Sequence, residues 1–138
     1  MVLILHQQDV WRAEAEYGEL KRHAGMVVSE MLQENNFETT GEAGEIHTIN
    51  PKLQGLQELN PDVIGWIEIP ESNIDYPVMQ GDNNQYYMDH TFYGTESAAG
   101  SVFMETQNRS DFSDLVTFVY GHRMRDGSMF GNLKYYED

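Results

Sequence analysis

The first third of the chain carries apolar residues at helical spacing. Between roughly Gln8 and Gln33 they recur at alternating intervals of three and four, which places them on one face of a helix. The stripe consists of Val10, Ala13, Tyr17, Leu20, Ala24, Val27 and Met31. Charged residues lie off this stripe, so we expect the helix to pack on the chain's own domain, with a short coiled coil as the alternative.

A polar, acidic and glycine-containing stretch at residues 34–49 predicts a flexible linker. The Asn-Pro pair at 50–51 then has the order of a helix N-cap followed by a first helical residue. Leucines at every third position predict a short helix, which the Asn-Pro pair at 60–61 should end. We therefore expect a helical segment at 1–33, the linker, and one β-rich domain at 50–138.

From residue 63 onward the apolar pattern becomes typical of β-strands. Runs rich in β-branched and aromatic residues stand between turn-forming clusters, at residues 63–69, 74–80, 100–105 and 115–121. The fourth run is the most hydrophobic, so we expect a buried strand there. Pro77 lies inside the second run and predicts a sheet edge or a β-bulge. The expected fold class is mainly β with N-terminal helices, and such a set of strands should leave unpaired sheet edges.

The segments between and after these runs predict turns and short helical pieces. Residues 83–92 indicate one helical turn followed by a loop. Asp126 and Gly127 have turn chemistry, and Ser128 is a candidate helix cap. The apolar residues spaced for one helical face after this turn are Met129, Phe130, Leu133 and Tyr136.

Composition and charge narrow the function classes. The chain has 23 acidic and 8 basic residues, a formal net charge of −15. This balance argues against nucleic acid and anionic lipid as partners, because both require clustered Lys and Arg. The chain has no cysteine, so disulfides, thiolate metal sites and a cysteine nucleophile are excluded. The apolar start, MVLIL, is much shorter than the roughly 20 residues of a membrane span, so we expect no membrane anchor here.

The histidines are the remaining candidates for chemistry, and they are His6, His23, His47, His90 and His122. No pair has the spacing of a helical zinc site. His122 differs by context, because it follows the fourth run, and strand ends present side chains on a rigid base. It is a candidate acid/base group. The alternatives are a histidine hydrogen-bonded at a strand end and a metal site shared with His90. Thr117 and Ser128 lie near His122 in sequence but do not complete a catalytic triad.

Three motifs in fixed order give the sequence a family resemblance. N-P-D-x-x-G-W-I occupies residues 60–67, I-D-Y-P-V-x-Q-G occupies 74–81, and Y-G-H-x-x-x-x-G-S-M-F occupies 120–130. Together they resemble the class B sortases, cysteine transpeptidases that anchor surface proteins to the Gram-positive cell wall. The resemblance runs from about Leu53 to Tyr136, and the N-terminal helix and linker resemble the helical preface of class B members.

The resemblance implies a closed eight-stranded β-barrel with added helices, of which this chain would hold about four strands. It implies acyl transfer at a Cys-His-Arg site, with a sorting-signal peptide and a cell-wall precursor amine as partners and with no cofactor. By motif, His122 falls on the catalytic histidine, and Asn84 and Met88 fall near the sorting-signal groove. The implied location is the extracellular face of a Gram-positive cell membrane.

The chain departs from the family in its other two catalytic groups. The family's cysteine, within a T-L-x-T-C motif, and its arginine come later than any residue of this sequence. Arg123 and Arg125 are neighbours of His122, but the family's arginine comes from another strand. We therefore expect these 138 residues to be inactive by themselves. A missing C-terminal half, or self-association, is a further expected partner. A non-enzymatic peptide-binding or pseudo-enzyme module is the alternative.

Overall fold

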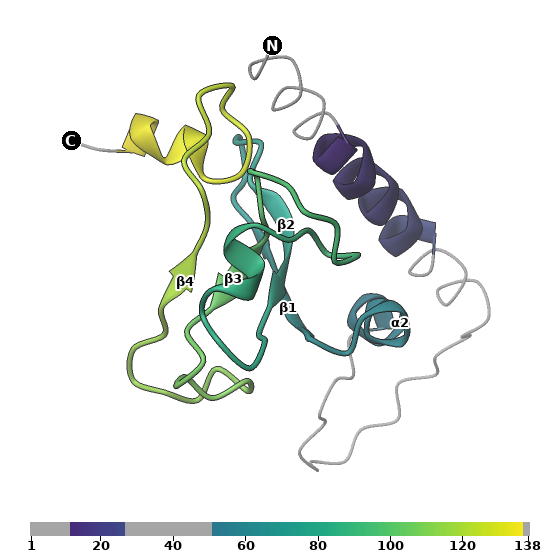
Figure 1. Ribbon diagram of the computed structural model, residues 1–138, viewed down its shortest axis with the longest axis vertical. Coiled ribbons are helices and arrows are strands. Elements are labelled where there is room, and N and C mark those ends of the chain that lie inside the picture. The colour runs from purple at the N-terminus through teal and green to yellow at the C-terminus, as the bar shows by residue number, and fades with distance from the viewer. Residues whose placement is uncertain (1–11, 27–50, 137–138) are drawn as a thin grey trace, which may run out of the picture.

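A computed structural model of the chain describes residues 12–26 and 51–136 (Figure 1). The expected linker, the apolar start and the outer members of the stripe at 10, 27 and 31 lie outside the described residues. Residues 12–26 form a helix, which is followed in the described part by α2 (Pro51–Leu59). The remaining elements are β1 (Val63–Glu68), β2 (Asp75–Met79), the 3₁₀ helix η1 (Tyr86–Met88), β3 (Val102–Met104), β4 (Val119–Tyr120) and the 3₁₀ helix η2 (Gly131–Tyr136).

The strands form one open, mixed sheet in the order β1-β2-β3-β4. β1 and β2 are antiparallel, β2 and β3 are parallel, and β3 and β4 are antiparallel. In the described sheet β1 and β4 each have a neighbour on one side only. The expected class, mainly β with N-terminal helices and unpaired edges, is confirmed. No helix in the described ranges has the length and apolar character to cross a bilayer.

The helix at 12–26 packs on the domain, as its stripe predicts. Ala13, Tyr17, Leu20 and Ala24 are all buried and belong to the same core as the strands. The Tyr17 hydroxyl donates a hydrogen bond of 2.7 Å to the carbonyl oxygen of Gly100. Burial raises the pKa of the Tyr17 phenol well above its ordinary value, because the charged form would lose its hydration. The helix therefore contacts the long loop that precedes β3 (Figure 1).

Asn60 ends α2 and starts β1, as its position before a proline predicts. Its main-chain N–H donates to Leu56, and its side-chain oxygen accepts from the N–H of Asp62. The other end of the Asn60 carboxamide donates a hydrogen bond of 2.7 Å to the carbonyl of Phe92. One residue thus closes the helix, forms the turn and connects that turn to the loop before β3.

The prediction of a buried fourth strand over residues 115–121 is wrong. Only Val119 and Tyr120 form β4, while Leu115 is fully exposed and Phe118 is mostly exposed. The cause is the carboxamide of Asn108, which donates to the carbonyl of Val116 and accepts from the N–H of Phe118. These backbone groups are bonded to a side chain and are not available to a sheet, so loop geometry overrides β-propensity.

Pro77 lies in an inner strand rather than at a sheet edge. It pairs with Trp66 of β1, and the register with β3 begins at the next residue, Val78. A proline nitrogen without hydrogen therefore faces no β3 partner, which makes the position tolerable. The bulge that Pro77 also suggested lies in the partner strand, between Val63 and Gly65.

The predicted helical face after residue 127 is also wrong. Met129 precedes η2, forms a bridge with Arg123 and has a left-handed backbone with φ of 53°. Met129 is buried, whereas Leu133 and Tyr136 are exposed, so they share no face. Ser128 does not cap the helix, because its hydroxyl donates to Asp126.

We expect the substitution Tyr17→Phe to destabilise the fold by about 1–3 kcal/mol, because it leaves the buried Gly100 carbonyl without its hydrogen-bond donor. Urea unfolding followed by circular dichroism measures the change. Tyr135→Phe is the matched control, since Tyr135 is 73% exposed and its loss should change stability by less than about 0.5 kcal/mol. Equal stability of both variants would show that the helix does not depend on this contact.

Candidate functional site

A pocket of about 350 Å³ lies between η1 and β4. Its lining residues are Asn84, Met88, Phe103, Tyr120, Gly121 and His122. The structure thus brings together on one surface all three residues that the sequence indicates, although they lie up to 38 positions apart in the chain. Pockets with apolar walls and a few convergent polar groups are the usual form of a ligand site.

His122 is held in place through its main chain. Its carbonyl accepts a hydrogen bond of 2.9 Å from the N–H of Phe130. Gly121 makes this return possible, because a Cβ atom at position 121 would lie 2.8 Å from the Phe130 ring. The loop at 122–130 therefore folds back against the end of β4, and the imidazole projects at the pocket.

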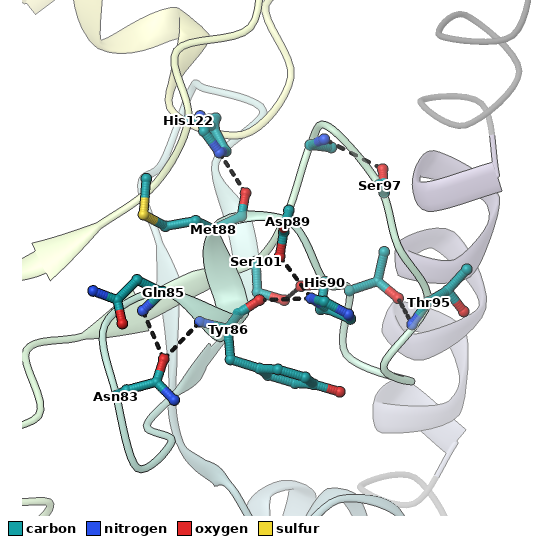
Figure 2. A network of polar contacts seen from close by, with 12 residues as sticks. Asn83, Gln85, Tyr86, Met88, Asp89, His90, Thr95, Ser97, Ser101 and His122 are labelled. Carbon is teal, nitrogen blue, oxygen red and sulfur yellow. Dashed lines mark hydrogen bonds and ion pairs between the residues drawn. The ribbon is translucent and has the colours of Figure 1, made fainter.

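The imidazole of His122 has a main-chain partner. Its Nε2 lies 2.5 Å from the carbonyl oxygen of Met88, as Figure 2 shows. A carbonyl oxygen only accepts hydrogen bonds, so Nε2 carries the proton in this contact. The other ring nitrogen, Nδ1, is then the acceptor in the neutral imidazole. A sequence motif predicts the histidine but gives no sign of this carbonyl.

The 3₁₀ helix η1 is fixed at its start by Asn83. The side-chain oxygen of Asn83 accepts from the N–H groups of Gln85 and Tyr86, at 2.8 and 2.9 Å (Figure 2). At the other end, the carbonyl of Tyr87 accepts from the N–H of Ser101 at 2.9 Å. The segment that carries Met88 is therefore bonded on both sides, which defines the position of the pocket wall.

Asn84 is oriented by two internal hydrogen bonds. Its side-chain nitrogen donates to the carboxylate of Glu105 at 2.5 Å, and its oxygen accepts from the N–H of Thr106 at 3.0 Å. Because a carboxylate accepts and an N–H donates, these partners fix which end of the carboxamide is which. The carboxamide keeps one further donor and one further acceptor for a ligand.

Glu105 is a site residue that sequence reasoning missed. Its carboxylate accepts from Asn84 and from the Tyr120 hydroxyl, the latter at 3.0 Å, so it joins two pocket residues from opposite sides. These bonds, with that of Asn84 first, lower the pKa of Glu105. The same carboxylate raises the pKa of Tyr120, because it accepts the phenol proton and its charge opposes the phenolate. The only signal in the sequence is an acid directly after a strand.

The remaining walls of the pocket are apolar. Phe103 of β3 and Tyr120 of β4 are paired in the sheet, and their ring centroids lie 5.4 Å apart. Phe103 is buried, whereas Met88 and Tyr120 are partly exposed. Sequence reasoning identified only Met88, because the pairing that places Phe103 and Tyr120 here is a cross-strand contact.

His90 has its own local partners and does not join His122. Its Nδ1 lies 2.7 Å from Asp89 Oδ1 and 2.9 Å from the carbonyl of Tyr86, and its ring stacks on that of Tyr86 (Figure 2). Within residues 12–26 and 51–136, no three His, Cys, Asp or Glu side chains gather as metal ligands. The metal-site alternative therefore has no support from the described part. His23 is exposed, and His6 and His47 lie outside that part.

Solved structures define the class of the fold. The chain superposes on sortase B from Bacillus anthracis, solved in complex with AAEK1, with a TM-score of 0.72 at 30% identity, covering 95% of this chain and 56% of that chain. It superposes on a substrate complex of Staphylococcus aureus sortase B with a TM-score of 0.73 at 27% identity, covering 94% of this chain and 53% of that chain. The chain is therefore class B sortase-like, and its sheet is an incomplete sortase-type β-barrel.

Curated sequences agree with this class. The chain is 42% identical over 100 residues to sortase B of Listeria monocytogenes serovar 1/2a, a match that covers 72% of this chain and 39% of that protein. The resemblance seen in the three motifs is confirmed, and it concerns the N-terminal portion of these relatives. The chain spans less than half the length of the curated relatives it matches. No protein-family model matches the chain.

We expect Glu105→Gln to lower the pKa of Tyr120 toward its ordinary value of about 10, because the substitution removes the charge that opposes the phenolate. Ring ¹³C resonances of Tyr120, followed from pH 8 to 12, measure the change. Glu68→Gln on the exposed part of β1 is the control and should leave Tyr120 unchanged. A Tyr120 titration that is identical in Glu105→Gln and in the unaltered chain would contradict the predicted contact.

Proposed function

We propose that this chain supplies the histidine-bearing part of a class B sortase site. His122 acts as the acid/base group, and Asn84 and Met88 form one side of the groove for a sorting-signal peptide. The observation that carries the proposal is that these three residues, identified by motif alone, line the same pocket. The similarity of the fold to a sortase B solved with its substrate supports the same assignment.

The chemistry of the pocket fits an extended peptide. Met88, Phe103 and Tyr120 offer apolar surface, while Asn84 keeps one free donor and one free acceptor for a peptide bond. An imidazole at the same pocket is able to give a proton to a leaving amine and take one from an incoming amine. Those two proton transfers are what acyl transfer between amines requires of an acid/base group.

The covalent step needs a group that these 138 residues do not contain. In the family, a cysteine forms a thioacyl enzyme, and an arginine stabilises the oxyanion. This chain has no cysteine, so no thioester forms on it. His122 therefore serves a nucleophile supplied by another polypeptide segment, either a C-terminal half of the barrel or a partner chain.

The kinship with sortase B also suggests where the reaction takes place. We propose that the protein acts at the extracellular face of a Gram-positive cell membrane, where a cell-wall precursor supplies the acceptor amine. The enzyme class is then that of a cysteine transpeptidase that anchors surface proteins. The acidic balance of the chain, with a net charge of −15, is compatible with partners other than nucleic acid.

A non-enzymatic peptide-binding module is the second candidate function. It is favoured by one specific observation, which is that the peptide pocket is formed while the sequence holds no cysteine. Such a pseudo-enzyme would retain Asn84 and Met88 for binding and would use His122 as a hydrogen-bonding group. It would also need a stable, cooperative fold of its own.

We expect the chain, incubated with a sorting-signal peptide and an amine acceptor, to yield no transpeptidation product, because no thioacyl intermediate forms without a cysteine. Mass spectrometry of the peptide measures cleavage and amine transfer. A full-length cysteine-bearing class B sortase is the positive control. Peptide cleavage by this chain that disappears in the variant His122→Ala would overturn the proposal that the nucleophile comes from elsewhere.

We expect Met88→Ala and Asn84→Ala each to weaken binding of the sorting-signal peptide by about tenfold, which corresponds to ~1.4 kcal/mol, because each removes a contact at the pocket. Fluorescence anisotropy with a labelled peptide measures the affinity. Met26→Ala is the matched control, since Met26 is exposed on the N-terminal helix. Equal affinities in all variants would exclude this pocket. A single cooperative thermal transition in the isolated chain would favour the binding module.

A further inference from the structure

The carbonyl that contacts the His122 imidazole lies against a glycine from another segment. A Cβ atom at Gly100 would lie 2.5 Å from the Met88 carbonyl oxygen and 2.6 Å from that of Tyr87. Real side chains do not approach a carbonyl oxygen so closely, so any other residue would displace these two carbonyls. Gly100 also has a left-handed backbone, with φ of 55°, which side chains disfavour.

We propose that Gly100 is a positioning residue for His122 and acts through the main-chain carbonyl of Met88. Without a side chain at 100, the end of η1 lies close enough to the loop before β3 for the Met88 carbonyl to accept from Nε2 of His122. The contact orients the ring and places the proton on Nε2, leaving Nδ1 as the acceptor. The proposal rests on the proposed acid/base role of His122 only for its consequence in catalysis.

The same arrangement joins peptide binding to the imidazole. Met88 contributes its side chain to the pocket and its carbonyl to His122, so one residue contacts both the ligand surface and the acid/base group. A peptide that moves η1 therefore moves the acceptor of the His122 hydrogen bond. Specificity and proton transfer are linked through one peptide unit, which no motif in the sequence reveals.

The N-terminal helix supports the position of Gly100. The Tyr17 hydroxyl donates to the Gly100 carbonyl, and the next residue, Ser101, donates its N–H to the Tyr87 carbonyl. Gly100 is thus fixed from one side by the helix and from the other by η1. A connected set of hydrogen bonds runs from the helix at 12–26 to the imidazole of His122.

The experiment uses the 138-residue chain with ¹⁵N-labelled histidine and ¹³C-labelled methionine carbonyls, assigned at Met88 through ¹⁵N-labelled Asp89. In the unaltered chain at pH 8 to 9, we expect the neutral His122 ring to be almost entirely in the Nε2–H form. In Gly100→Ala, we expect both tautomers to be present and the Met88 carbonyl resonance to shift upfield, in the direction of a lost hydrogen bond.

Gly94→Ala is the matched control. Gly94 also has a left-handed backbone, with φ of 75°, but a Cβ atom there would meet only the hydroxyl of Tyr86, at 3.0 Å. This variant should carry a comparable backbone strain while leaving both the His122 tautomer and the Met88 carbonyl resonance unchanged. An equal change in both variants would show a general loosening of the fold and would overturn the role of Gly100.

A second variant keeps the test decisive if Gly100→Ala does not fold. His122→Ala removes the donor, so it should shift the Met88 carbonyl resonance upfield, and the double variant should add nothing to that shift. An unchanged Met88 resonance in His122→Ala would overturn the proposed hydrogen bond. These resonances are independent of peptide and of activity, so failure of the proposed sortase function would leave the result standing.

Discussion

The hydrogen bonds accepted by the three successive carbonyls of η1 are the constraint on which the candidate site depends. The carbonyl oxygens of Tyr86, Tyr87 and Met88 contact groups from His90, Ser101 and His122 in that order. A single 3₁₀ turn is not stable in isolation, because its hydrogen bonds are few and poorly aligned. Its conformation here is set by three outside segments, and those segments are in turn held together by it. The pocket wall and the imidazole therefore form as one unit.

Sequence patterns predicted the parts of the site that lie on a motif. His122, Asn84 and Met88 were identified from the order of their neighbours, and the structure places all three at one pocket. Glu105 and Gly100 were missed, because their roles are contacts made across long sequence separations. Glu105 joins Asn84 to a tyrosine on another strand, and a glycine's role in close packing is invisible until the opposing backbone is in place.

The fold shows the same division between local and distant causes. The helical stripe and the first three strands were predictable, because burial on one face imposes a period on the residues that form it. The fourth strand was not, since the apolar run at 115–121 is drawn into a loop by the Asn108 carboxamide. A side chain seven residues upstream of this run thus decided the backbone conformation, and no period in the sequence records such a bond.

The shape of the pocket depends on what pairs with β4. Tyr120 lines the pocket and lies in a strand that has one neighbour in the described sheet, while Leu115 and Phe118 are exposed just before it. An exposed apolar segment next to a free strand edge favours pairing with another main chain. The net charge of −15 opposes pairing between two copies of this chain, and salt weakens that repulsion. A strand that does pair with β4 lies beside Tyr120, within reach of the surface where His122 waits for a nucleophile, so completing the sheet and completing the site are the same physical event.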